Sequence, residues 1–139
     1  MKKEKNTPAL PEETVLKKDD SALRRNKAWS GRFEEATDRK VEEFTTSLPF
    51  DKRLYSHDID GSIAHVKMLA KQNIIKKTEA VAIVKELDKI REEIAAGAFI
   101  FFDSDEDIHM AIERELTSRL GEIGGKLHTA RSRNDQVSL

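Results

Sequence analysis

Apolar residues recur every three or four positions over long stretches of this chain, which is the spacing that lines one face of an α-helix. The first such stretch predicts a helix from about Asp51 to Gln72, with Asp51 capping its start and Asn73 ending it in the left-handed conformation. The apolar stripe of this helix consists of Tyr55, Ile59, Ile63, Val66 and Ala70.

Two further helices follow from the same spacing. Thr78 is positioned to cap the first of them, and Gly97 to end it. Its stripe is Ala80, Val84, Leu87, Ile90 and Ile94, with Ile83 on the flank. After a short apolar turn over residues 98–102, Ser104 and Asp107 form a capping-box arrangement for the next helix, which ends at Gly121. The stripe of that helix is Ile108, Ile112, Leu116 and Leu120.

Upstream of these helices, a short polar helix is expected around Asp38 to Thr46, broken at residues 47–50 because the residue before Pro49 is disfavoured in helical geometry. No segment has the alternation typical of a strand. Charged residues make up 37% of the chain and aromatic residues only 6%, which suits helices with one apolar face. The predicted fold class is therefore all-α, with a flexible charged arm over residues 1–27 and a helical domain over residues 28–139.

The overall composition excludes several classes of function. A formal net charge of −1 gives no basis for wholesale binding to nucleic acid or to an anionic membrane. No apolar run approaches the roughly 20 residues that a membrane-spanning helix needs. The sequence has no cysteine, so it offers no thiol nucleophile and no cysteine-type zinc site, and this suits a reducing cytoplasm.

Two polar clusters stand out against the helical pattern. Asp105, Glu106 and Asp107 crowd one helix N-terminus, where carboxylates complement the helix dipole. His109 lies two residues beyond Asp107 and does not share its face, so no metal-binding pair is predicted there.

The second cluster begins at the glycine pair Gly124–Gly125 and runs to Gln136. Two arginines in this segment could each hold a carboxylate with a planar fork, and neutral side chains beside them could fix its orientation. The segment is thus either a pocket for a small molecule with several carboxylates or a solvated loop between helices.

In this order, these segments resemble the N-terminal part of the argininosuccinate lyase family, within the fumarase/aspartase superfamily. The matching segments are Trp29–Phe33, Phe50–Leu54, Asp58–His65, Glu106–Glu113, Gly124–Thr129 and Arg131–Val137. The last segment is the most specific, because other members of the superfamily share the fold but not this string. The likeness covers about residues 28–139.

The resemblance implies a reversible β-elimination that splits argininosuccinate into arginine and fumarate, without a cofactor or a metal. It implies that Ser47 and Asn134 bind substrate and that Arg133 grips the succinyl end. Supporting roles fall to Asp51, Asp107, His109, Arg131, Ser132 and Gln136. The family enzymes are homotetramers, so a tetramer is expected of the full-length protein.

Some features depart from the family pattern. Ala130 stands where glycine is common, and alanine does not easily adopt a positive φ. Family members run to several hundred residues, and their catalytic histidine and serine segments come later, so no catalytic acid or base is expected within these 139 residues. The 139-residue chain is therefore expected to be an inactive, poorly folded fragment. Alternative interpretations are another fumarate-releasing lyase, a non-catalytic structural relative, or a helical interaction module.

Overall fold

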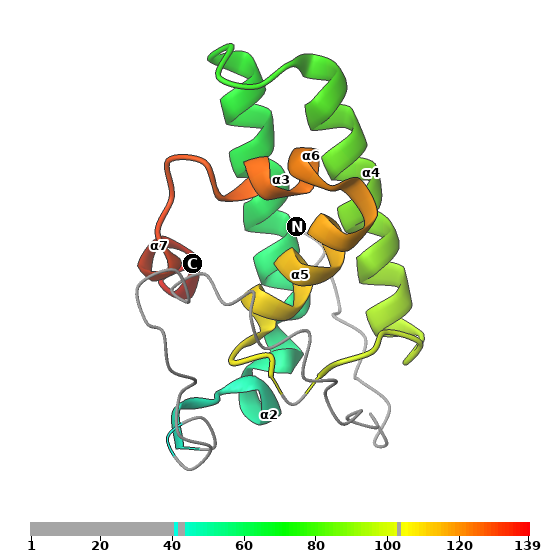
Figure 1. Cartoon of the computed structure of the whole chain (residues 1–139), viewed down its shortest axis with the longest axis vertical. Coiled ribbons are helices and arrows are strands. Elements are labelled where there is room, and N and C mark those ends of the chain that lie inside the picture. The colour runs from blue at the N-terminus through cyan, green and yellow to red at the C-terminus, as the bar shows by residue number, and fades with distance from the viewer. Residues whose placement is uncertain (1–40, 42–43, 103) are drawn as a thin grey trace, which may run out of the picture.

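The structure of this chain is a computed structural model that describes Val41, residues 44–102 and residues 104–139. Within these residues it contains only helices and irregular segments (Figure 1), so the all-α prediction is confirmed. Its elements are α2 (Leu48–Asp51), η3 (Lys52–Leu54), α3 (Tyr55–Lys71), α4 (Lys77–Ala95), α5 (Ile108–Leu120), α6 (Glu122–Gly125), η4 (Lys126–His128) and α7 (Arg133–Val137).

Several predictions fall outside the described residues. They include the arm over residues 1–27, the turn at residues 29–33 and most of the short helix expected around residues 38–46. Within the described part of the chain, no helix is long and apolar enough to cross a membrane.

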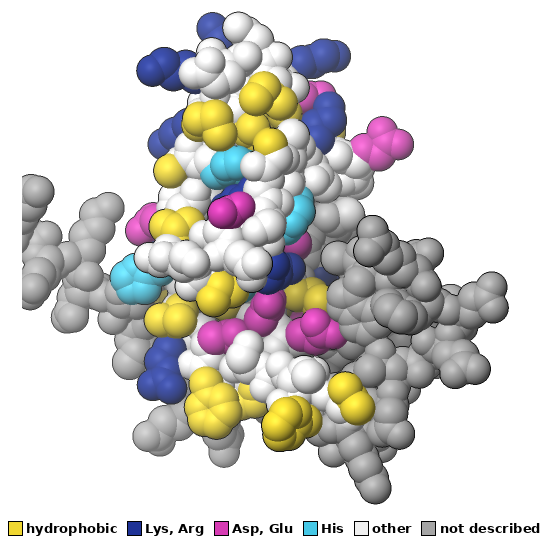
Figure 2. Space-filling model, turned by 90° about the vertical axis from the view of Figure 1, so that its left-hand side faces the viewer, with side chains coloured by type: hydrophobic (Ala, Val, Ile, Leu, Met, Phe, Trp, Pro, Cys, Tyr) yellow, Lys and Arg dark blue, Asp and Glu magenta, His cyan; other side chains and the backbone are white. Residues whose placement is uncertain are grey.

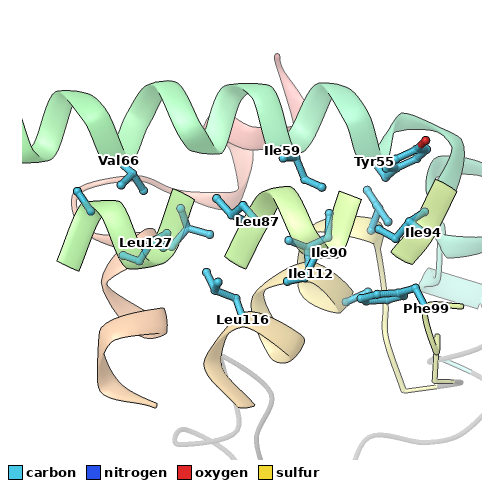
Figure 3. Close-up of a cluster of buried hydrophobic side chains, with 14 of the residues drawn as sticks. Tyr55, Ile59, Val66, Leu87, Ile90, Ile94, Phe99, Ile112, Leu116 and Leu127 are labelled. Carbon is cyan, nitrogen blue, oxygen red and sulfur yellow. The ribbon is translucent and has the colours of Figure 1, made fainter. Parts of the chain in front are cut away.

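The long helices α3 and α4 form an antiparallel hairpin, and α5 lies across it and packs against both (Figure 1). Their stripes meet in one hydrophobic core, where Ile59, Leu87 and Ile112 are fully buried (Figure 3). Burying a side chain of this size contributes roughly 1.5–3 kcal/mol. Most of the predicted stripe residues are buried, but Ile63, Val84 and Leu120 are only partly buried at the edge of the core. Ile83, expected on the flank, is completely buried.

The predicted helix ends are confirmed by the backbone. Asn73 has φ 58°, Gly97 has φ 70° and Gly121 has φ 57°, each at the end of its helix. Gly124 is required for another reason, because a Cβ there would lie 2.6 Å from the backbone oxygen of Leu116. The glycine thus lets α6 approach α5 closely.

The predicted helix starts are wrong at three places. The helix expected from Asp51 is divided into α2, η3 and α3, and Pro49 lies in the first turn of α2, where a missing N–H costs little. Thr78 does not cap α4, which begins at Lys77, because the Glu79 side chain accepts the Lys76 backbone N–H at 3.0 Å. A capping box begun by Ser104 is also not observed, because Asp107 itself is the N-cap of α5.

Asp105 does not support the dipole of α5 as expected. It is 1% exposed and accepts the Phe102 backbone N–H at 2.9 Å. Its Oδ1 also accepts a hydrogen bond from Arg114 Nε at 2.9 Å. Asp105 therefore belongs to a partly buried ion pair with Arg114, which fixes the segment before α5 to that helix.

The turn that leads to α7 is strained at one residue. Ala130 has φ 54°, a left-handed conformation that costs an L-residue other than glycine roughly 1–2 kcal/mol. Beyond it, part of the predicted loop is helical, since residues Arg133–Val137 form α7.

We expect Ala130→Gly to raise the free energy of unfolding of the full-length protein by about 1 kcal/mol, because glycine removes the strain of the positive φ. Urea unfolding followed by helical circular dichroism measures the change. Ala96→Gly is the matched control: Ala96 ends α4 with φ −82°, so the same substitution there should destabilise by about 0.5–1 kcal/mol. Equal losses at both positions would contradict the assignment of strain to Ala130.

Candidate functional site

Polar side chains from α2, α3, α5 and α7 gather around the N-terminal half of α5. Figure 2 displays this side of the molecule, where acidic, basic and histidine side chains lie among hydrophobic ones. The cluster is built by segments far apart in the sequence, from Ser47 before α2 to Arg133 on α7.

Two carboxylates satisfy the N-terminus of α5. Asp107 Oδ1 accepts the Met110 backbone N–H at 2.6 Å, as an N-cap side chain does. Asp51 Oδ1 accepts the Ile108 backbone N–H at 3.1 Å, so the residue expected to cap its own helix instead caps α5. Burial raises the pKa of Asp107, and the negative charge of Asp51 raises it further. The hydrogen bond from the Met110 N–H and the positive charge of Arg133 act in the opposite direction but are outweighed.

Ser47 is held beside Asp51. Its hydroxyl donates to Asp51 Oδ2 at 2.5 Å, and its backbone N–H donates to the Glu106 carbonyl at 2.8 Å. The residue before α2 is thereby fixed to the segment before α5. Ser47 remains exposed, so its oxygen is accessible to a ligand.

Arg133 meets three acceptors, one at each guanidinium nitrogen. Its Nε lies 3.3 Å from Asp107 Oδ2, and its Nη2 lies 3.3 Å from Glu113 Oε2. Its Nη1 donates to Gln136 Oε1 at 2.6 Å. The planar group is therefore oriented by α5 on one side and by its own helix on the other.

Glu113 uses both carboxylate oxygens. Oε2 contacts Arg133, and Oε1 lies 2.8 Å from His128 Nδ1. One carboxylate on α5 thus connects η4 to α7.

His109 connects α5 to α3. Its Nδ1 donates to Asp58 Oδ1 at 2.7 Å, and both residues are buried. Burial by itself lowers the pKa of His109, but the hydrogen bond to Asp58 and the charges of Asp58 and Asp107 outweigh it, and the pKa is raised.

Arg131 lies between α3 and α7 and is only partly satisfied. Its Nη2 donates to Ser62 Oγ at 3.2 Å, whereas its Nε and Nη1 are buried without a partner among the described residues. Burial lowers the pKa of Arg131, although the nearby charges of Asp58 and Glu113 act in the opposite direction.

The remaining predicted residues lie on or beside α7. Gln136 is 3% exposed and binds Arg133, while its Nε2 has no partner among the described residues. Ser132 and Asn134 are both exposed. The Ser132 backbone N–H donates to Asp135 Oδ2 at 2.8 Å, which fixes the start of α7. The structure thus joins Ser47, Asp51, Asp107 and Arg133 in one chain of contacts, with Asn134 next to it in sequence.

Among the described residues, no group of three histidine, cysteine, aspartate or glutamate side chains could hold a metal ion. The chemistry of the cluster is that of paired carboxylates and guanidinium groups, which recognise anions and cations through charge-assisted hydrogen bonds.

Sequence reasoning missed Asp58, Ser62 and Glu113. Asp58 and Ser62 are four residues apart on the buried face of α3, so each is a polar residue within an apolar stripe. Glu113 lies four residues after His109 and therefore on a similar side of α5. These helical spacings are the features of the sequence that could have indicated the three residues.

A family model described as "Lyase" matches residues 31–139. The chain belongs to this lyase family. It is 56% identical over 115 residues to the argininosuccinate lyase of Syntrophus aciditrophicus (strain SB), covering 83% of this chain and 24% of that protein. Over 113 residues it is 58% identical to the argininosuccinate lyase of Moorella thermoacetica (strain ATCC 39073 / JCM 9320), covering 81% and 24% of the two chains.

A third relative, the argininosuccinate lyase of Campylobacter concisus (strain 13826), is 54% identical over 125 residues, which cover 89% of this chain and 26% of the relative. The resemblance inferred from the motifs is confirmed. The chain spans about a quarter of the length of these curated relatives.

We expect Asp58→Asn to lower the pKa of His109, because the neutral amide removes the charge that opposes the effect of burial. In the unchanged chain the raised pKa adds stability below about pH 6.5, and this stability is lost as pH rises through the folded value. Proton NMR titration of the His109 ring measures its pKa. Urea unfolding at about pH 6 and pH 8 measures the stability that depends on it. A His109 pKa that is unchanged or higher in the variant would contradict the assignment.

Proposed function

We propose that the whole protein is an argininosuccinate lyase, which reversibly cleaves argininosuccinate into arginine and fumarate. The similarity to argininosuccinate lyases over most of this chain carries the proposal. The contacts around α5 are suited to the charges of such a substrate, which has carboxylates at its succinyl end and a guanidinium group in the middle.

The reaction places definite demands on the site. A base removes a proton from the carbon next to a succinyl carboxylate, and the electron pair is delocalised into that carboxylate. This pair then forms the double bond of fumarate as the carbon–nitrogen bond breaks, and an acid protonates the departing guanidinium nitrogen. Donors and cations that stabilise the extra charge on the carboxylate lower the barrier.

Arg133 is our candidate for the grip on the succinyl carboxylate. A guanidinium group has five N–H donors, and one donor on each of its three nitrogens is directed to Asp107, Gln136 or Glu113. Two donors remain for a ligand, one on each terminal nitrogen, which is what a forked contact with a carboxylate requires. Arg131 supplies a second positive charge nearby, as its electrostatic interaction with Arg133 indicates.

Ser47 and Asn134 are proposed as the neutral contacts that fix the orientation of substrate. Both are exposed, and Asn134 follows Arg133 directly on α7. Because the Ser47 hydroxyl hydrogen is directed at Asp51, its oxygen lone pairs are free to accept an N–H from the substrate. Asp51 and Asp107 place negative charge on the same side, which suits the guanidinium part of the substrate.

We assign neither the catalytic acid nor the base to a residue of this chain. Among the histidines that the structure describes at the site, His109 is committed to Asp58 and His128 to Glu113. Both are therefore better suited to holding neighbours than to exchanging protons with substrate.

We further propose that the whole protein works as a cytoplasmic homotetramer. Exposed apolar side chains favour association, because Phe50 is 70% exposed and Val137 is 66% exposed. These 139 residues contain no cysteine, which is compatible with a reducing compartment. Light scattering on the full-length protein tests the tetramer.

We expect the full-length protein to release fumarate from argininosuccinate, followed by ultraviolet absorbance. Arg133→Ala should lower kcat/KM by about 100-fold or more, because the forked contact with the carboxylate is lost and buried acceptors are left unpaired. Arg91→Ala is the control, since Arg91 pairs with the exposed residue Asp60 on the α3–α4 surface and should leave turnover nearly unchanged.

Near-normal turnover of Arg133→Ala would refute the carboxylate grip. No fumarate from the wild-type tetramer would instead favour another fumarate-forming lyase or a non-catalytic relative.

A further inference from the structure

We propose that Glu113 is a positioning residue that sets the orientation of the Arg133 guanidinium group, with His128 holding the other oxygen of the same carboxylate. This inference rests on the function proposed above. It concerns a residue for which the motifs and the resemblance gave no role.

Both carboxylate oxygens of Glu113 are in contact with other residues of the site. Its Oε2 lies 3.3 Å from Arg133 Nη2, and its Oε1 lies 2.8 Å from His128 Nδ1. Both partners are donors, so each oxygen has one donor and the carboxylate cannot rotate without breaking a contact.

Glu113 and its two partners lie on different elements. Glu113 lies in the middle of α5, whose inner face is fixed by fully buried residues such as Ile112 and Leu116. His128 and Arg133 instead belong to η4 and α7, which flank the turn strained at Ala130. A long helix thus supplies the carboxylate, and two short helical elements joined by a strained turn supply the two groups that it orients.

The contacts of the Arg133 guanidinium group differ in which element supplies them. Gln136 belongs to the same five-residue helix as Arg133, so its contact cannot fix that helix relative to the rest of the site. Asp107 and Glu113 are the acceptors contributed by the α5 segment, at Nε and Nη2. Without Glu113, Asp107 would be the one contact left between the α5 segment and the guanidinium group, because the remaining contact at Nη1 comes from Gln136 and moves together with α7. Glu113 therefore decides which way the two remaining donors point.

The test uses the full-length protein and the variants Glu113→Ala and Glu115→Ala. Glu115 lies on the same helix and binds Arg119 and Arg114, away from Arg133, so it is the matched control for loss of a carboxylate from α5. We expect Glu113→Ala to raise KM for argininosuccinate on the order of tenfold, with a smaller change in kcat. Glu113→Gln keeps one acceptor oxygen but loses the charge, so its KM should lie between those of the wild type and Glu113→Ala. Glu115→Ala should leave KM unchanged even if it lowers the melting temperature.

A double-mutant cycle separates positioning from a general structural effect. In an Arg133→Lys background there is no fork to orient, so Glu113→Ala should change KM by less than about twofold. The same rise in KM in both backgrounds, or a rise equal to that of Glu115→Ala, would overturn the proposal.

Crystal structures of the full-length wild type and of Glu113→Ala provide a readout that does not depend on activity. A rotated or disordered Arg133 guanidinium group in the variant is the expected result, and an unmoved group would overturn the proposal. If the wild type releases no fumarate, the proposed function fails, and these structures still decide whether Glu113 orients Arg133.

Discussion

The hydrogen bonds at the N-terminus of α5 are the interactions on which the rest of the site depends. The free N–H groups of a helix start need acceptors, and here one comes from the N-cap Asp107 and another from Asp51, which is 57 residues away in the sequence. The second oxygen of each carboxylate then reaches outward, to Ser47 from Asp51 and to Arg133 from Asp107. Satisfying one helix end therefore brings α2 and α7 to the same place.

This arrangement requires that α5 itself be held firmly. Its apolar face is buried against the α3–α4 hairpin, and the buried contact between His109 and Asp58 adds a polar link to α3 (Figures 1 and 3). A buried polar pair adds little net stability but penalises any shift that separates the two groups, so it fixes the position of α5 along α3. The exposed face of the same helix can then present Glu113 and the N-cap carboxylate at defined positions.

The sequence predicted the parts of the fold that depend on local periodicity. Most residues in the stripes of α3, α4 and α5 are buried as expected, and Asn73, Gly97 and Gly121 end their helices. Helix starts were predicted less well, because several nearby residues can cap a helix and tertiary contacts select among them. Asp51, which matched a local cap, is instead used by a distant helix.

The candidate site was predictable mainly through family resemblance. Motifs identified Ser47 and Arg133, but pairings between segments cannot be derived from one sequence, so the partner of His109 was missed. Glu113 was missed for a related reason, since a glutamate on a charged helix usually faces solvent and its contacts with Arg133 and His128 arise only from the fold.

The most direct test of this account is the crystal structure of the full-length protein with argininosuccinate bound to an inactive variant. We predict a succinyl carboxylate within hydrogen-bonding distance of the Arg133 guanidinium group, and the substrate in contact with Ser47 Oγ beside the N-terminus of α5. A substrate bound away from this end of α5, with Arg133 still occupied only by Asp107, Glu113 and Gln136, would contradict it.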